Sequence, residues 1–492
     1  MKKLLSLSLL LITVIALAGC ATKTAPEPEV NCDDYPNASQ CQVADPDNPQ
    51  PGLVEVLDAL PTEEITIDFW HVYGQEKEAL LLDYIAEFEA LYPNITVNAT
   101  SQGGYDDLRN KTILAMSAGN TPTMLVAYPD HVAGYLNGDA VIPLDDFIYD
   151  ETWGVDVDDF IESYLDENRQ YQGGFMYSLP YSKSTEMMVF NKTIFEANGI
   201  TIPMDEALSF ADLEGFMATM VGDGANQCEY LINYDSSSNL FINSVRQWDA
   251  GYTNSEGDIL VGDSKTNDML SYLKSKFENK MIALPIAWDQ QYGSTNFKAG
   301  DSCMTVGSTA GISYNIPDPG TFEIGVAPVP QWDEDHLSAV QQGPNVAIMK
   351  DSTSAERLAA WLFIKYITDT EQTAKWSMLT GYLPVRTSGF ESPMYQEFLS
   401  ISDMDAAGTL DAYVFSAGLQ DLLGNPADYV YESMTAQAGF AQIDYNQYDP
   451  AFSMEHASSS DARLQAGIIT EAIFGGTVSV EEAIQAMLDE LS

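Results

Sequence analysis

Hydrophobic residues follow two different periods in the first third of the chain. They alternate over Ile65–His71, which predicts a strand, and recur every three or four positions over Glu76–Tyr92, which predicts a helix. A strand over Ile95–Ala99, a helix over Asp106–Ala118 and a strand over Thr123–Tyr128 follow in the same way. This βαβαβ order favours an α/β fold with an open, largely parallel sheet that is flanked by helices.

Aromatic residues gather where these strands end. Trp70 lies at the end of the first strand, Tyr105 in the loop after the second, and Tyr128 and Asp130 after the third. One aromatic residue at such a place is compatible with packing in the core. Three at successive strand ends favour a binding surface, because ligands of open α/β sheets lie beyond the carboxyl ends of the strands. These four residues are therefore candidate ligand contacts.

The next segment has the pattern of a crossing between two lobes. Apolar runs at Tyr177–Tyr181 and Glu186–Phe190 are separated by the polar run Ser182–Thr185. Small hydroxyl side chains inside a strand suit a segment that presents side chains to a ligand, so the last two residues of the polar run are candidate contacts. A chain of 492 residues is long enough for two large lobes.

The rest of the chain continues with helical and strand-like patterns. Helices are expected over Phe210–Met220, Phe241–Asp249, Ser354–Ile367, Glu371–Met378 and Gly475–Leu491, and strands over Tyr230–Tyr234 and Asn345–Met349. A second crossing is expected at Gln341–Gly343. Residues Met404–Pro450 follow neither period, and the sequence predicts irregular structure there.

The charge balance argues against two classes of partner. The chain has 21 basic and 73 acidic residues, a formal net charge of −52, which repels nucleic acids and anionic membrane surfaces. It contains no GxxxxGK[ST] or GxGxxG motif for a nucleotide. It has no CxxC pair, and its four histidines are scattered. We therefore expect no nucleic-acid partner, no cofactor and no metal.

The N-terminus indicates export. Lys2 and Lys3 precede the apolar run Leu4–Ala16, which is too short for an ordinary membrane span, and Leu17–Cys20 resembles a bacterial lipobox. This pattern predicts a signal peptide over residues 1–19, acylation of Cys20, for example with palmitate, and a flexible tether over residues 20–62. The protein would then lie on the extracytoplasmic face of the cell membrane, held by its lipid anchor only. A plain signal peptide with an accidental cysteine is the alternative.

Four further cysteines could form disulfides in an exported chain. Cys32 and Cys41 are close together inside the predicted tether. Cys228 and Cys303 could pair only if the fold brings them together. The sequence leaves both pairings open.

Four runs of the chain stand out as motifs: Ile65–His71 (ITIDFWH), Leu179–Asn191 (LPYSKSTEMMVFN), Phe297–Ser308 (FKAGDSCMTVGS) and Thr380–Arg386 (TGYLPVR). Together they resemble one family, the solute-binding proteins of carbohydrate-type ABC importers (extracellular solute-binding protein family 1). The resemblance implies a two-lobe periplasmic-binding-protein fold of the type II-like kind, with crossing strands, a ligand in the cleft and closure about a hinge. The expected lobes are residues 63–177 plus 343–390 and residues 178–342 plus 391–492. A monomer that delivers a small-molecule carbohydrate to the transmembrane subunits of an ABC permease is implied.

The resemblance, which is nearest to the glycerol-3-phosphate and maltose types, also implies a set of ligand contacts. Together with the candidates at the strand ends, the expected binding residues are Trp70, Tyr105, Tyr128, Asp130, Ser184, Thr185, Trp248, Ser308, Gly343, Tyr382 and Arg386. Aromatic rings in this set suit the apolar faces of sugars, whose hydroxyls need fixed polar partners.

Two departures from the glycerol-3-phosphate type bear on the ligand. That type has a glutamate after the third strand, where this chain has Asp130, and an arginine in a late Gly-Leu-Arg run, where this chain has Gln420. The loss of a bidentate cation favours a neutral sugar or oligosaccharide over a phosphorylated ligand. Lys183 or Arg386 could replace that cation, so glycerol 3-phosphate or a glycerophosphodiester remains the alternative.

A secreted carbohydrate-active enzyme and a surface scaffold are the competing classes. With 73 carboxylates, some pair at catalytic separation arises by chance, so pairs of acids are uninformative. Gly307–Gly311 (GSTAG) does not have the frame of a GxSxG motif. A scaffold would explain the tether but not the aromatic residues at the strand ends. The sequence therefore predicts a binding protein without enzymatic activity.

Overall fold

A computed structural model describes residues 54–254, 256–451 and 458–492. Four sequence predictions concern residues outside the described ones: the signal peptide, the acylation of Cys20, most of the tether, and the open question of a Cys32–Cys41 disulfide. Within those residues, no helix combines the length and the apolar character needed to cross a membrane.

The first lobe is built on a five-stranded sheet with the order β2-β1-β3-β11-β4. Its strands are β1 (Ile65–His71), β2 (Ile95–Ser101), β3 (Met124–Ala127), β4 (Leu179–Pro180) and β11 (Asn345–Ile348). Strand β1 runs parallel to β2 and β3, whereas β11 runs antiparallel to β3 and β4. The α/β fold and the parallel order of the first three strands are confirmed. Because β4 belongs to this sheet, the chain leaves the lobe after Pro180, slightly later than the predicted boundary at residue 178.

Helices cover both faces of this sheet. They are α1 (Gln75–Leu91), α2 (Tyr105–Ala118), α3 (Pro129–Asn137), α4 (Asp145–Ile148), α5 (Glu162–Arg169), α12 (Ser354–Ile367), α13 (Thr370–Thr380) and α14 (Thr387–Phe390). Alternate residues of β1 are buried, as its period predicts. Phe69 packs edge-on against Phe363 of α12, with ring centroids 5.9 Å apart, and Phe363 packs against Phe88 of α1 at 5.1 Å.

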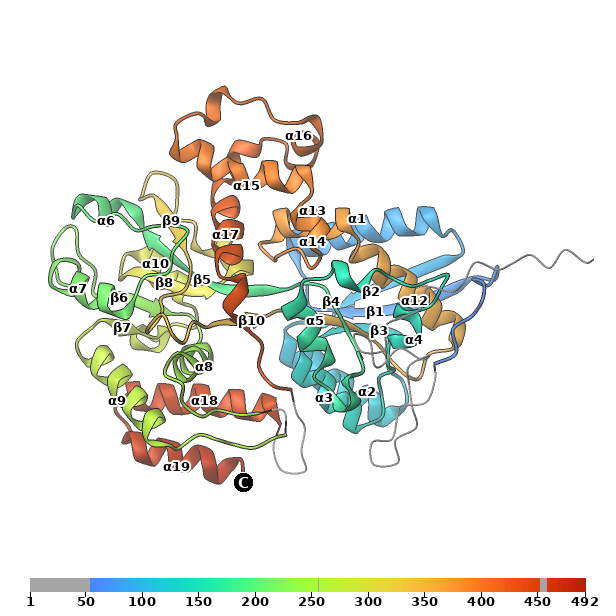
Figure 1. The fold of residues 1–492 in the computed structure, drawn as a ribbon, viewed down its shortest axis with the longest axis horizontal. Coiled ribbons are helices and arrows are strands. Elements are labelled where there is room, and N and C mark those ends of the chain that lie inside the picture. Colours follow the sequence, from blue (N-terminus) through green and yellow to red (C-terminus); the bar gives the residue numbers. More distant parts are fainter. Residues whose placement is uncertain (1–53, 255, 452–457) are drawn as a thin grey trace, which may run out of the picture.

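The second lobe has a larger sheet in the order β12-β10-β5-β8-β6-β7, with β9 paired to β5. Its strands are β5 (Ser184–Asn191), β6 (Tyr230–Tyr234), β7 (Ile282–Ala283), β8 (Ser302–Ser308), β9 (Ile324–Ala327), β10 (Ala339–Gln342) and β12 (Asn446–Gln447). Its helices are α6 (Lys192–Ala197), α7 (Phe210–Met220), α8 (Ser237–Gln247), α9 (Ser264–Glu278), α10 (Gly293–Ala299), α11 (Ile312–Asn315), α17 (Val430–Ala441), α18 (Ser459–Phe474) and α19 (Val480–Glu490). Every residue of β5 is buried, which makes it the central strand. Figure 1 shows the two lobes side by side, with the C-terminal helices α18 and α19 returning to the second lobe.

A disulfide lies in the core of the second lobe. Cys228 and Cys303 are buried and bonded, with Cα atoms 5.5 Å apart and a sequence separation of 75. The bond joins the turn before β6 to β8. The fold therefore brings together the pair that the sequence left open.

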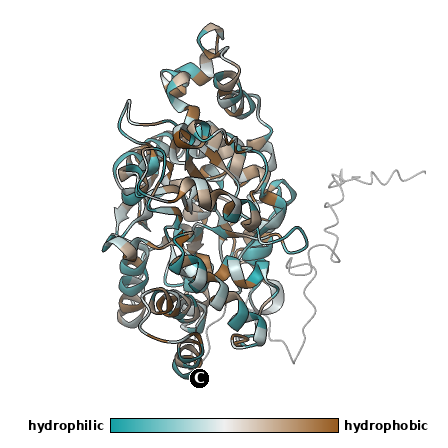
Figure 2. Ribbon diagram, turned by 90° about the vertical axis from the view of Figure 1, so that its left-hand side faces the viewer, coloured by the Kyte–Doolittle hydropathy of each residue, from teal (hydrophilic) through white to brown (hydrophobic). Residues whose placement is uncertain are grey.

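A group of helices stands above the two lobes in Figures 1 and 2. It comprises α15 (Pro393–Ala406) and α16 (Ala417–Leu423), and α17 continues from it into the second lobe, against β5 and β9. The prediction of irregular structure over Met404–Pro450 is wrong for this part. In α17 the four consecutive residues Ser433–Ala436 are all buried, so the helix shows no apolar stripe that a periodic pattern could reveal.

Two segments connect the sheets directly, one between β4 and β5 and one between β10 and β11 (Figure 1). Gly343, in the second of them, has φ +93°, and a Cβ atom at this position would collide with the backbone carbonyl of Ser182 in the first. The two crossing segments therefore pass each other in close backbone contact, which requires glycine.

One buried ion pair holds both crossing segments to the first lobe. The Lys183 ammonium contacts the Glu167 carboxylate of α5 and donates to the Gly343 carbonyl at 2.8 Å. Glu167 also accepts from Gln341 Nε2 at 3.2 Å and from Asn345 Nδ2 at 3.1 Å. A single carboxylate thus fixes the positions of residues on both crossings.

Candidate ligand-binding cleft

Two adjacent cavities lie between the lobes, with volumes of about 650 Å³ and about 520 Å³. Both volumes are in the range of small-molecule sites. Tyr105 and Tyr128 of the first lobe and Gln342 of β10 line both, so the cavities meet at these three residues. We call the larger the tyrosine cavity and the smaller the charged cavity.

The tyrosine cavity has an aromatic wall from the first lobe. Tyr105, Tyr128 and Tyr382 line it; the hydroxyls of Tyr105 and Tyr382 are 3.3 Å apart, and the rings of Tyr105 and Tyr128 are 4.5 Å apart. Trp376 stacks behind Tyr382, and Lys77 Nζ lies 5.2 Å from the centre of the Tyr382 ring. Burial raises the pKa of each of the three tyrosines, so all are neutral hydroxyls at neutral pH.

Polar side chains of the second lobe, most of them small, form most of the opposite wall, together with two further tyrosines and one lysine. They are Ser184, Asp235, Tyr292, Ser294, Thr295, Lys298, Thr305, Ser308, Tyr314 and Asn315. The Asp235 carboxylate, just after β6, accepts the Gly293 N–H at 2.6 Å, and burial raises the pKa of this carboxyl. Aromatic rings on one side and hydroxyl, amide and carboxylate groups on the other suit a ligand with apolar faces and many hydroxyls.

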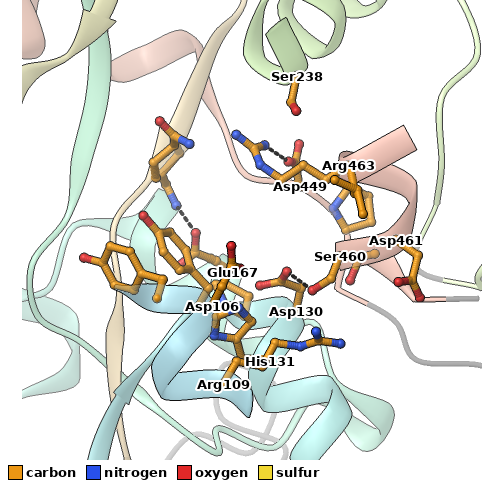
Figure 3. Close-up of a pocket in the computed structure, with 18 of the residues that line it drawn as sticks. Asp106, Arg109, Asp130, His131, Glu167, Ser238, Asp449, Ser460, Asp461 and Arg463 are labelled. Atoms are coloured by element: carbon orange, nitrogen blue, oxygen red, sulfur yellow. Dashed lines mark hydrogen bonds and ion pairs between the residues drawn. The ribbon is translucent and has the colours of Figure 1, made fainter. Parts of the chain in front are cut away.

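Charged side chains from both lobes line the charged cavity (Figure 3). They are Asp106, Arg109, Asp130 and Glu167 of the first lobe, and Asp449, Asp461 and Arg463 of the C-terminal part; His131 lies among them. Arg463 pairs with Asp449 at 2.8 Å, and Asp449 also pairs with Arg246 at 2.6 Å, so the Arg463 guanidinium is held in place. Burial lowers the pKa of His131, which keeps its imidazole neutral at pH 7.

The lobes are in contact across the cleft beside both cavities. Lys77 of α1 donates to the carbonyl of Ala310, next to the tyrosine cavity, at 3.0 Å. The hydroxyl of Ser460, at the start of α18, donates to the carboxylate of Asp130, at the start of α3 (Figure 3). The structure therefore shows a conformation in which the lobes touch on either side of the cleft.

The fold brings six of the predicted binding residues into this cleft. Tyr105, Tyr128, Ser184, Ser308 and Tyr382 line the tyrosine cavity, although they come from five separate parts of the chain. Asp130 lines the charged cavity.

Trp70, Trp248 and Arg386 lie outside both cavities. Trp248 follows the last turn of α8, which ends two residues earlier than predicted, and stacks on Trp332 at 4.1 Å in the second lobe. Trp70 packs against the core of the first lobe. Arg386 is buried, pairs with Asp159 at 3.3 Å and stacks on a phenylalanine ring. Each of these side chains is occupied by packing or pairing within its own lobe.

Thr185 and Gly343 also lie outside both cavities and belong to the crossing segments. The Thr185 hydroxyl donates to Asn446 Oδ1 at 2.8 Å and accepts from Gln442 Nε2 at 3.0 Å, which links β5 to the C-terminal part of the lobe. Lys183, the other replacement cation considered for a phosphate, is engaged by Glu167. Neither candidate cation is therefore directed at the cleft.

Sequence reasoning missed several residues of the cleft. Asp235 immediately follows the predicted strand Tyr230–Tyr234, so the rule of strand carboxyl ends, applied to the second lobe, would have found it. Lys77, Tyr292 and Arg463 lie in helices or turns without a distinguishing local pattern. Only the packing of the lobes identifies them.

A buried acid lies next to the cleft and gives a prediction of pH dependence. The Glu186 carboxylate accepts from Asn239 at 2.6 Å and from Asn243 at 2.7 Å, and burial raises its pKa from 4.5 to about 7. The folded chain then binds this proton more tightly than the unfolded chain. The contribution of Glu186 to the free energy of unfolding is therefore greatest below pH 4.5 and is lost as the pH rises towards 7. We expect Glu186→Gln to raise the free energy of unfolding at pH 8 by up to ~3 kcal/mol.

Urea denaturation of the wild type and of Glu186→Gln at pH 5 and pH 8 measures this effect. Asn243 Oδ1 has no hydrogen-bond partner among the described residues, so its amide can turn to accept from the new glutamine. The increase in the free energy of unfolding of Glu186→Gln over the wild type should be small at pH 5 and largest at pH 8. An equal difference at the two pH values would refute the assignment. Asp145, whose pKa burial also raises to about 7, contributes to the pH dependence that remains in the variant.

Known proteins of similar sequence and structure share this two-lobe architecture. A family model described as bacterial extracellular solute-binding protein matches residues 83–399. The sn-glycerol-3-phosphate-binding periplasmic proteins UgpB of Escherichia coli (strain K12) and Shigella dysenteriae serotype 1 are each 23% identical over 343 residues, which cover 68% of this chain and 77% of the relative.

Two solved structures illustrate the similarity of fold. UgpB from Mycobacterium tuberculosis, in complex with glycerophosphocholine, superimposes with a TM-score of 0.65 at 19% identity, covering 87% of this chain and 97% of that one. The GacH receptor of Streptomyces glaucescens, solved unliganded and with acarbose, gives 0.64 at 18% identity with the same coverage. At these identities the likeness concerns the fold.

Proposed function

The chain belongs to the family of bacterial extracellular solute-binding proteins, and we propose that it is the substrate-binding component of an ABC importer. It captures a sugar or oligosaccharide between its lobes and delivers it to the transmembrane subunits of the permease. Acyl chains on Cys20 hold it, as a monomer, at the extracytoplasmic face of the cell membrane. It has no enzymatic activity of its own.

The composition of the tyrosine cavity carries this proposal. Its aromatic wall, formed by Tyr105, Tyr128 and Tyr382, faces a wall of hydroxyls, an amide, the Asp235 carboxylate and the Lys298 ammonium. Sugar rings match such a site because their C–H faces pack on aromatic rings while their hydroxyls find donors and acceptors. A carboxylate in the cavity accepts from hydroxyls but repels a phosphate.

A glycerol 3-phosphate or glycerophosphodiester ligand is the second candidate. Lys77 and Lys298 line the tyrosine cavity and are cations within reach of a phosphate there. The UgpB relatives are named for glycerol 3-phosphate. Against this candidate stand Asp235 in the same cavity and the engagement of Lys183 and Arg386 by carboxylates elsewhere.

Thermal unfolding of the purified full-length protein with a panel of ligands tests the proposal. The panel contains maltose, maltotriose, cellobiose, glycerol 3-phosphate and glycerophosphocholine. A ligand that binds only the folded state at a hundredfold excess over its Kd stabilises it by about 2.7 kcal/mol. We expect a shift with a sugar that is recovered unchanged. A shift with the phosphates alone would support the second candidate, consumption of a sugar would indicate an enzyme, and no shift at all would contradict both.

Asp235→Asn separates the two ligand classes. The asparagine Oδ1 still accepts the Gly293 N–H, so the wall keeps its shape while the negative charge is removed. We expect sugar affinity to fall about 10-fold to 100-fold, because charge-assisted hydrogen bonds are lost. Affinity for a phosphate would instead rise. Titration calorimetry measures both, with the exposed Asp205→Asn as the control that changes net charge equally. Unchanged sugar affinity in Asp235→Asn would show that the carboxylate does not contact the ligand.

A further inference from the structure

We propose that Gly381 is a positioning residue for the ligand, because its lack of a side chain sets the separation of the two walls of the tyrosine cavity. In placing the ligand in that cavity we rely on the proposed function. Gly381 directly precedes Tyr382 on the wall of the first lobe. Thr309 directly follows Ser308 on the opposite wall. The turns that carry these residues touch, so their contact fixes how closely the two walls can approach.

The two turns, residues 380–383 of the first lobe and residues 308–311 of the second, meet backbone to backbone. Gly381 ends α13 in the left-handed conformation, with φ +76°. A Cβ atom at this position would lie 2.6 Å from the carbonyl oxygen of Thr309 and 3.2 Å from the Cα atom of Ala310. Neither atom belongs to a flexible side chain that could turn away. Any side chain at position 381 must therefore displace one of the two turns.

The turn of the first lobe is fixed within its own lobe. The Gly381 N–H donates to the Ser377 carbonyl at 3.1 Å, and the Ser377 hydroxyl donates to the Tyr382 carbonyl at 2.6 Å. Trp376 stacks behind the Tyr382 ring, with the ring planes 15° apart. Retreat of this turn would break these contacts, so a side chain at position 381 is expected to push the second lobe away instead.

Both turns lie beside the hinge. The Leu383 N–H donates to the carbonyl of Lys183, in the first crossing segment, at 2.7 Å. Ser308 ends β8, which pairs with β5 directly after that crossing. Lys77 of the first lobe holds the carbonyl of Ala310 in the same place, at 3.0 Å. Because lobes of this kind rotate about their crossing segments, a displacement here turns one lobe against the other and widens the tyrosine cavity.

Gly381→Asn tests the inference with little backbone strain, because asparagine tolerates the left-handed conformation at a helix C-terminus. Gly119→Asn is the matched control. Gly119 ends α2 of the same lobe in the left-handed conformation, with φ +62°. Among the described residues beyond its chain neighbours, nothing lies within 4 Å of a Cβ atom at this position. Both variants place asparagine at a left-handed helix end, but only position 381 lies against the other lobe.

Pulsed electron paramagnetic resonance measures the separation of the lobes in the full-length protein. The spin labels are attached to p-acetylphenylalanine, which replaces Leu82 and Asp318 and leaves the native cysteines untouched. Both positions are exposed, the first on α1 of the first lobe and the second just beyond α11 of the second lobe. We expect a longer distance between the labels in Gly381→Asn than in the wild type, with or without maltotriose. Gly119→Asn should keep the wild-type distance.

Titration calorimetry with maltotriose, cellobiose and glycerol 3-phosphate measures the consequence for binding. For each probe that the wild type binds, Gly381→Asn should weaken the affinity by about tenfold or more, because the two walls can no longer contact the ligand together. Gly119→Asn should keep the wild-type affinity within about twofold. A role in stability alone would change the urea midpoint of Gly381→Asn but not its affinity.

An unchanged label distance in Gly381→Asn would overturn the inference, and so would an equal loss of affinity in the two variants. If the wild type bound none of the three probes, the calorimetry would contradict the proposed function. The label distance would still decide whether Gly381 sets the separation of the lobes, so the two failures are distinguishable.

Discussion

Replacing Lys183 by methionine is expected to lower the free energy of unfolding by about 3–5 kcal/mol, the cost of breaking a buried ion pair from one side. The Lys183 side chain is fully buried, and the side chain of its partner Glu167 is 2% exposed. Methionine fills the same space but leaves the Glu167 carboxylate with the amides of Gln341 and Asn345 as its remaining side-chain partners. An uncompensated charge in a dry site is the source of the loss.

Urea denaturation at pH 7 measures the loss, and two further variants identify its origin. The double variant Lys183→Met, Glu167→Gln should be more stable than Lys183→Met alone, because it removes the stranded charge. Lys192→Met removes a half-exposed lysine whose carboxylate partners lie 3.9 Å away, and should cost less than 1 kcal/mol. A loss below 1 kcal/mol for Lys183→Met would show that the pair does not secure the crossing segments.

Removing the disulfide is expected to cost about 4 kcal/mol. Cys228 and Cys303 close a loop with a sequence separation of 75 residues, and a cross-link of this length strongly restricts the unfolded chain. Both residues are buried beside β6 and β8, so Cys228→Ala with Cys303→Ala also leaves a small unfilled space. The second lobe should lose stability, since both cysteines belong to its core.

Denaturant titration of the oxidised wild type and of the double alanine variant measures this difference. Peptide mapping of the exported protein without reduction should recover the two cysteines as one cross-linked peptide. Recovery of two free thiols, together with equal stability of the variant, would contradict the bond. The bond also agrees with export, because disulfides persist in oxidising compartments.

Local patterns determined much of the secondary structure. The predicted strands Ile65–His71 and Tyr230–Tyr234 and the predicted helices Phe210–Met220 and Ser354–Ile367 have the same bounds in the structure. Ile65–His71 carries the alternation of a half-buried strand, Tyr230–Tyr234 is a short run that is buried almost throughout, and each of the two helices carries an apolar stripe that follows a capping residue. Elements without such a signal, such as α17, were missed because they are buried on more than one side.

The sequence by itself determined the family, the α/β class and five residues that line the tyrosine cavity, because strand ends and short motifs record these features locally. Tertiary structure alone decided which of the other candidates reach the cleft. Trp248 and Arg386 have the right chemistry, but packing on Trp332 and pairing with Asp159 keep them inside their lobes. The charged cavity exists only because α18 returns across the cleft, a long-range contact that no local pattern of hydrophobic and polar residues encodes.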